Sequence, residues 1–148
     1  MYRRGYWRNG ANRSKSLPPV RRKRLGYPDL KRAVLEQAET HRATIVLIED
    51  KASGTQLIQD LSGEFYGVKA HTPPAGVEKI MRFNAQTHLF ENGFVYLPSN
   101  APWLAEYERE LTSFPGSKYD DQVDSTTQAL DYMRGPAAAL EVWARLGR

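Results

Sequence analysis

Three aspartates occupy five successive positions in the stretch YDDQVDS, which begins at Tyr119. Asp121 and Asp124 are three residues apart and Asp120 and Asp124 are four apart, so on a helix each pair shares one face. Carboxylates this close repel one another unless positive charge is held beside them, and either a metal ion or the positive end of a helix dipole meets this need. No Lys or Arg lies among residues 119–133 to neutralise them locally. The stretch therefore predicts either a metal site or a helix start.

A second pair of acids follows the apolar run TIVLIED, residues 44–50. This run is typical of a central strand buried on both faces, and its C-terminal end delivers Glu49 and Asp50. Ligands of α/β sheets collect at the C-terminal ends of strands. A two-metal phosphodiesterase needs hard oxygen ligands of this kind for two Mg²⁺ or Mn²⁺ ions about 3.5–4 Å apart. The two acidic stretches together are compatible with such a site, and the absence of a P-loop pattern excludes ATP hydrolysis by that route.

Helices and strands alternate along the chain that would position these acids. Apolar periodicity and boundary residues predict helices over 29–41, 53–61, 77–92, 102–112 and from about 120 to 134, and strands over 44–50, 65–71 and 94–98. Pro98 places the last strand at a sheet edge. Glu106, Glu108 and Glu110 alternate around the apolar stripe of their helix and are expected to form a solvated face. The alternation indicates an α/β domain with a partly parallel sheet.

Positive charge is concentrated at the beginning of the chain. Residues 1–32 hold eleven Lys or Arg and one acid, whereas residues 33–148 hold ten basic residues and sixteen acids. Residues 1–24 lack apolar periodicity, which predicts a basic, disordered arm. Such arms commonly contact nucleic acid, and the aromatic residues between the arginines could stack on bases. An untethered tail is the alternative.

The composition of the chain excludes several kinds of metal site and a membrane span. The chain has no cysteine and three scattered histidines, which excludes disulfides and Cys-type zinc sites, so any metal would be held by oxygen ligands. There is no run of 18 apolar residues and no apolar stretch behind the basic N-terminus. We therefore expect no membrane partner and a cytoplasmic location.

Three longer motifs follow one another along the chain: VLIEDKASGTQLIQDL, KIMRFNAQTHLFENGFVYLP and WLAEYERELTSFPGSKYDDQVDSTTQALDY. In these motifs the chain resembles the C-terminal nuclease domain of the large terminase subunit of tailed bacteriophages. The resemblance covers residues 25–134, and residues 135–148 are predicted to form an appended helix. The resemblance implies an α/β, ribonuclease-H-like nuclease fold and a metal-dependent endonuclease that cuts concatemeric viral DNA during packaging in a bacterial host cell.

The resemblance also implies roles for particular residues and partners. Matching positions make Glu49, Asp121 and Asp124 catalytic metal ligands, with Asp120 beside them, for a two-metal site holding Mg²⁺ or Mn²⁺. By the same resemblance, Lys79 and Arg82 are expected to approach the DNA backbone. Independently of the resemblance, the charge of the basic arm makes Arg21, Arg22, Lys23 and Arg24 candidates for contact with DNA. The implied partners are double-stranded DNA, the terminase ATPase domain, the small terminase subunit and the portal.

One part of the family pattern is missing. In the family, a first strand with a bridging Asp precedes the helix that begins here near Asp29, yet residues 1–28 contain no Asp or Glu. We therefore expect a fold truncated at its N-terminal strands, an incomplete metal site and little or no cleavage. One alternative is a non-catalytic DNA-binding or packaging-complex protein that uses the basic arm, while the acids only cap a helix; another is a fragment without function. Steep salt dependence of DNA affinity would mark the DNA-binding alternative, and dependence on Mg²⁺ would mark the nuclease.

Overall fold

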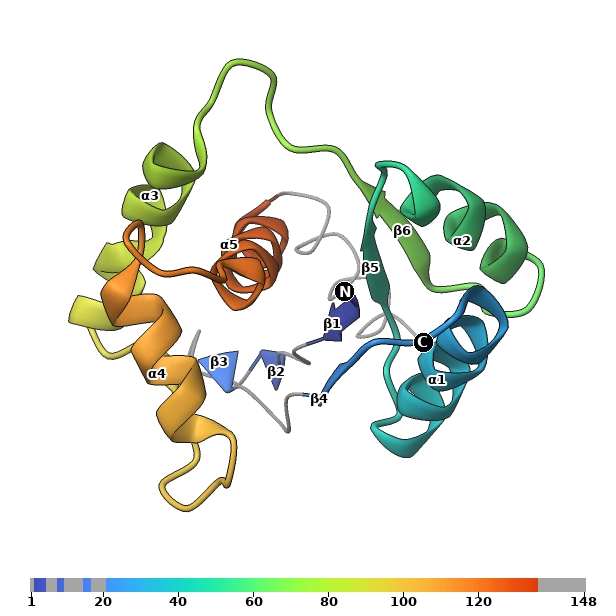
Figure 1. Cartoon of the computed structure of the whole chain (residues 1–148), viewed down its shortest axis with the longest axis horizontal. Coiled ribbons are helices and arrows are strands. Elements are labelled where there is room, and N and C mark those ends of the chain that lie inside the picture. Colours follow the sequence, from blue (N-terminus) through green and yellow to red (C-terminus); the bar gives the residue numbers. More distant parts are fainter. Residues whose placement is uncertain (1, 5–7, 10–14, 17–20, 136–148) are drawn as a thin grey trace, which may run out of the picture. The chain divides into compact units, whose positions relative to one another are not determined.

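The computed structural model describes residues 2–4, 8–9, 15–16 and 21–135 (Figure 1). The chain divides into two compact units, which are described separately. The first unit contains residues 1–2 and 22–76, and the second contains residues 3–21 and 77–148. The appended helix predicted after residue 135 lies outside the described residues.

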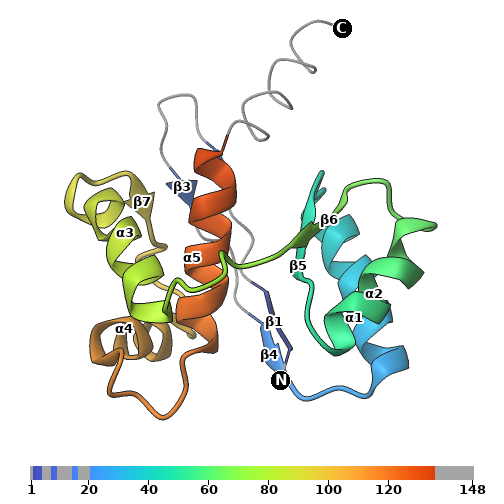
Figure 2. The same cartoon turned by 90° about the horizontal axis from the view of Figure 1, so that it is seen from above.

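The first unit is built from two helices and two parallel strands. Its elements are α1 (Tyr27–Thr40), β5 (Val46–Glu49), α2 (Ser53–Ser62) and β6 (Val68–His71). The strands pair in register from Val46 opposite Val68 to Glu49 opposite His71. Figure 2 shows both helices beside these strands. This arrangement is the strand, helix, strand unit that the sequence predicted.

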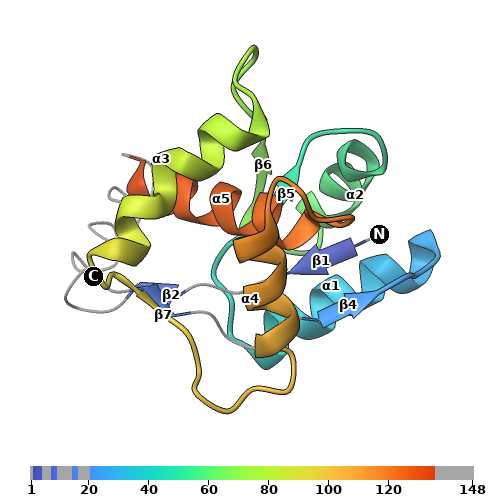
Figure 3. The same cartoon turned by 60° about the vertical axis from the view of Figure 1, so that its left-hand side comes forward.

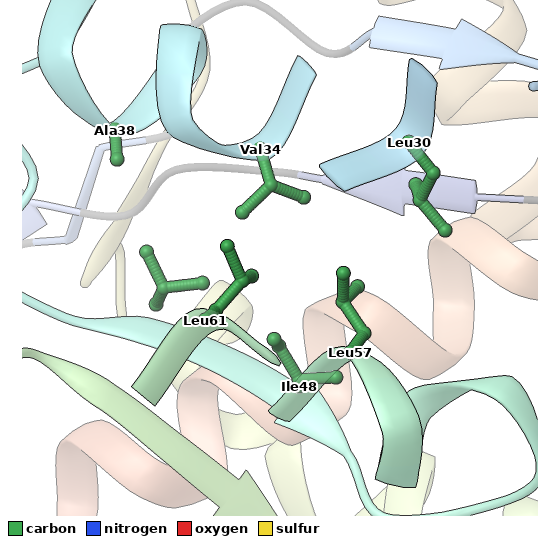
Figure 4. Packing of buried hydrophobic residues seen from close by; sticks show 7 residues of the cluster. Leu30, Val34, Ala38, Ile48, Leu57 and Leu61 are labelled. Carbon is green, nitrogen blue, oxygen red and sulfur yellow. The ribbon is translucent and has the colours of Figure 1, made fainter. Parts of the chain in front are cut away.

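A cluster of aliphatic side chains forms the core of the first unit (Figure 4). Successive residues of a strand point to opposite faces, and Val46 and Ile48 lie on the face covered by the helices. Leu47 and Glu49, on the other face, are only half-buried. The strand is therefore not buried equally on both faces as its continuous apolar run predicted, because α1 and α2 pack on the same side of it. The cluster consists of Leu30, Val34, Ala38, Val46, Ile48, Leu57 and Leu61.

The second unit contains three longer helices and a short strand. They are α3 (Lys79–Glu91), β7 (Val95–Tyr96), α4 (Leu104–Ser113) and α5 (Asp121–Arg134). Helix α5 packs against both α3 and α4. Tyr107 of α4 is fully buried, and its hydroxyl lies 2.9 Å from the Thr126 hydroxyl of α5, which satisfies both groups. Gly93 follows α3 with a φ of 68°, the left-handed conformation that ends many helices.

Short strands occur where the sequence predicted a disordered arm. They are β1 (Tyr2–Arg4), β2 (Arg8–Asn9), β3 (Lys15–Ser16) and β4 (Arg21–Lys23). β1 pairs with β4, and β3 lies between β2 and β7, with β2 and β7 visible together in Figure 3. For these residues the structure differs from the prediction, because ladder pairing uses backbone groups and does not require alternating apolar side chains. β7 lies at an edge of the three-stranded sheet, as was predicted from Pro98.

The helices and strands predicted after residue 24 are confirmed, with shifts of a few residues at their ends. Helices mixed with a small parallel sheet agree with the predicted α/β fold. The predicted domain boundaries after residues 24 and 134 remain predictions. Within the described part of the chain, no helix combines the length and apolar composition required to cross a membrane.

Candidate metal and nucleic-acid site

The acids at the beginning of α5 lie against two cations from α3. The Lys79 Nζ atom is 2.9 Å from Asp120 Oδ2 and 2.6 Å from Asp124 Oδ2. The Arg82 Nη2 atom is 3.7 Å from Asp124 Oδ1, an ionic contact too long for a hydrogen bond. Positive charge therefore does compensate these acids, but it comes from residues some 40 positions earlier in the sequence. Asp121, the first residue of α5, is half-buried and has interactions of its own.

Helix α5 is capped by a different carboxylate. Asp120 occupies the N-cap position, yet its side chain makes no capping hydrogen bond. Instead, the Glu110 carboxylate of α4 accepts hydrogen bonds from the backbone N–H of Gln122 and, at 2.8 Å, from the Gln122 side-chain amide. Glu110 is only 6% exposed. The expectation that Glu110 belongs to a solvated face is therefore wrong, because the start of α5 packs over it.

Sequence reasoning missed this capping role, although a signal was present. Glu110 follows the buried Tyr107 by three residues, which places both on one side of α4. Glu106 and Glu108 are exposed, as expected. Because Glu110 supplies the cap, Asp120 is not needed for it, and the simple explanation that all three aspartates serve helix capping loses support.

The pKa values of Asp124 and Lys79, which contact each other, are both raised but for different reasons. Burial raises the pKa of the Asp124 carboxyl, and together with the nearby Asp120 charge it outweighs the opposing effect of Lys79 and Arg82. Burial acts to lower the pKa of Lys79, but the hydrogen bonds to Asp124 and Asp120 and the charges of these two carboxylates together outweigh that effect and raise the pKa overall. Lys79 is therefore charged at neutral pH. Further positive charge near Asp124 would favour its ionised form.

The other end of α5 is tied to the same helix. The Arg134 guanidinium donates hydrogen bonds to the Ala85 carbonyl at 3.1 Å and to Gln86 Oε1 at 3.4 Å, both on α3. The beginnings of α3 and α5 thus meet through Lys79 and the acids, and the end of α5 meets the middle of α3. Contacts at both ends fix the register of the two helices that carry the charged cluster.

In the first unit, a tight turn follows Glu49. Gly54, in the first turn of α2, approaches the strand so closely that a Cβ atom there would lie 2.0 Å from the Glu49 carbonyl oxygen. Asp50 accepts a hydrogen bond of 2.6 Å from Thr55 Oγ1, which joins the strand end to the helix. His71 is the ladder partner of Glu49, and partners in a parallel ladder share a face. A histidine beside Glu49 could not be predicted from the sequence, because the register of strand pairing is not visible in one strand.

The predicted site residues therefore fall into two groups. Asp120 and Asp124 lie together with Lys79 and Arg82 in the second unit, whereas Glu49 belongs to the first. No cluster of three or more His, Cys, Asp or Glu side chains arranged for a metal occurs among the residues that the structure describes. Of the predicted DNA-binding residues, Arg24 is exposed, and Arg21, Arg22 and Lys23 form β4.

The donor chemistry of the α5 cluster fits a hard divalent cation in type. Asp120 and Asp124 present carboxylate oxygens that converge on one positively charged atom, and oxygen ligands are those that Mg²⁺ and Mn²⁺ prefer. Two converging carboxylates are fewer than a complete ligand set. Water or further protein oxygens would have to supply the rest.

The comparisons with known proteins connect this arrangement to a family. The model of the Terminase RNaseH-like domain matches residues 11–133, which is most of the chain. Neither a curated protein nor a solved structure matches this chain. The match includes the acids of both units, the two cations of α3 and the strand, helix, strand arrangement of the first unit. The chain belongs to the terminase RNase H-like nuclease domain family.

Proposed function

We propose that the chain is a metal-dependent endodeoxyribonuclease domain of phage DNA packaging that cuts double-stranded DNA only slowly, because residues 1–28 hold no acid to complete its metal site. The observation that carries the proposal is that the carboxylates of Asp120 and Asp124 converge on one positively charged atom, the Lys79 ammonium nitrogen, in a chain of this family. Glu49, Asp121 and Asp124 are the proposed metal ligands, with Asp120 beside them. Mg²⁺ or Mn²⁺ is the proposed metal, which when bound would polarise the scissile phosphate and activate water.

The residues of the chain have separable tasks in this proposal. The carboxylates hold the metal, and Glu110 fixes the first turn of α5 from which two of them project. Lys79 and Arg82 supply positive charge to the same region, where they can contact a DNA phosphate. The chain would act in the bacterial cytoplasm with an ATPase domain, a small terminase subunit and a portal as partners.

The experiment is a plasmid cleavage assay. Supercoiled DNA is incubated with the chain and Mg²⁺ or Mn²⁺, and nicked and linear products are quantified for the wild type, Glu49→Ala and Asp124→Ala. Glu108→Ala, which changes an exposed glutamate of α4, is the matched control. Cleavage by the wild type and the control but by neither site variant supports the proposal. A folded wild type that does not cut at any metal concentration contradicts it.

A second candidate function is non-catalytic DNA binding through the basic N-terminal residues. It is favoured by the excess of ten positive charges over residues 1–32. Affinity gained by neutralising phosphates falls steeply with salt. Changing Arg21, Arg22, Lys23 and Arg24 together to Gln should then weaken binding of a labelled duplex and flatten the salt dependence, whereas Asp124→Ala should leave both unchanged.

A further inference from the structure

Lys79 occupies the place between two carboxylates where a metal ion would be bound. Its ammonium nitrogen is shared by Asp120 and Asp124, at 2.9 Å and 2.6 Å, and it comes from a different helix. A hard cation takes carboxylate oxygens at about 2.0–2.6 Å, so it would claim the same oxygen atoms. An ammonium and a divalent ion cannot both occupy this position, because they repel each other.

The contact is not explained by stability alone. Glu110 already caps α5, so Asp120 is not held in place by a capping role. The Lys79 side chain is 43% exposed, and ion pairs this accessible to water contribute little to folding. Exposure also lets its flexible stem move away, whereas Arg82, at 17%, is held more firmly.

We propose that Lys79 is a built-in competitor for the divalent metal ion at Asp120 and Asp124. This inference rests on the proposed function in one respect, that the cluster is a metal site. Metal binding then requires Lys79 to leave the carboxylates. Its ammonium becomes available to a DNA phosphate, so the same side chain that excludes the metal from the free protein can contact the substrate once the metal is bound.

The test measures metal binding without cleavage. Mn²⁺ is titrated into the whole chain, and free Mn²⁺ is followed by its electron paramagnetic resonance signal. The variants are Lys79→Met, which removes the charge, and Lys79→Arg, which keeps it. Arg109→Met removes an exposed charge from α4 of the same unit and serves as the matched control. Thermal unfolding of each variant verifies that it is folded.

Lys79→Met should bind Mn²⁺ about tenfold more tightly than the wild type, because one nearby positive charge is removed. Lys79→Arg and Arg109→Met should bind like the wild type. Adding Asp120→Asn to Lys79→Met should abolish the gain. Equal or weaker binding by Lys79→Met overturns the proposal, as does a lack of Mn²⁺ binding by every variant.

The outcomes separate this inference from the proposed function. If the wild type cleaves DNA but Lys79→Met binds Mn²⁺ no more tightly, only the competition is wrong. If Lys79→Met gains affinity while the folded wild type does not cleave, the competition is correct and the nuclease function is wrong.

Discussion

Replacing Glu110 by Ala should destabilise the second unit more than replacing an exposed glutamate of α4 by Ala. Glu110 is 6% exposed and Gln122 is 3% exposed, so water cannot replace the lost hydrogen bonds. Loss of the cap costs about 0.5–2 kcal/mol. Leaving the buried Gln122 amide without its acceptor costs about 1–3 kcal/mol. We expect the free energy of unfolding to fall by about 2–4 kcal/mol, since the two costs overlap.

Urea unfolding followed by fluorescence is the appropriate assay. Trp103 packs edge-on against Tyr107, with ring centroids 5.8 Å apart, so it reports on the contact between α4 and α5. A background of Trp7→Phe and Trp143→Phe makes Trp103 the source of the signal. The variants are compared by their midpoints and slopes.

Two further variants make the Glu110 result interpretable. Glu110→Gln retains an acceptor for the Gln122 backbone N–H and should cost about half as much as Glu110→Ala. Glu108→Ala, at an exposed position, should change stability by less than about 0.5 kcal/mol. If Glu110→Ala proves as mild as Glu108→Ala, Glu110 is solvated and the capping argument is refuted.

Two other predictions concern the first unit. Gly54→Ala should cost about 2 kcal/mol or more, because the new Cβ would meet the Glu49 carbonyl oxygen at 2.0 Å and overpacking forces the backbone apart. Gly63→Ala, with no atom within 4 Å of its Cβ, is the control and should be neutral in thermal unfolding; similar losses in both would contradict the prediction. For Tyr27, burial and the hydrogen bond of 2.6 Å to Asp60 raise the pKa to about 12. This phenol favours the folded state below its unfolded pKa of 10, and the benefit is lost as the pH rises toward 12. In ultraviolet titration, Asp60→Asn should lower the Tyr27 pKa, and a wild-type Tyr27 that ionises near pH 10 would refute the assignment.

The secondary structure could be predicted because its signals are local. The helices that carry Lys79 and Asp124 show their apolar periodicity within a dozen residues, and Gly93 marks the end of α3 directly. The position of Glu49 at a strand end followed from one apolar run. The acids of α5 could be identified from their spacing in the sequence, because residues three or four positions apart lie side by side on a helix.

The partners of these residues could not be predicted, because pairing between distant segments leaves no local trace. Lys79 and Asp120 are 41 positions apart, and each has the appearance of an ordinary surface charge in the sequence. Glu110 was misassigned since alternation along a helix does not reveal what packs over its last turn. The strands before residue 24 were missed because backbone pairing, of β1 with β4 and of β3 with β2 and β7, does not depend on side-chain pattern.

The capping of α5 by Glu110 has a consequence for variants of this domain. Under the proposed function, folding and chemistry use different carboxylates, so the aspartates can change without removing the group that caps the helix. Substitution of Asp124 by Asn should therefore yield a folded protein that retains Lys79 and Arg82 beside α5. Under the proposed function, such a protein would bind DNA without cutting it, which would make it a reagent for trapping the complex before the cut.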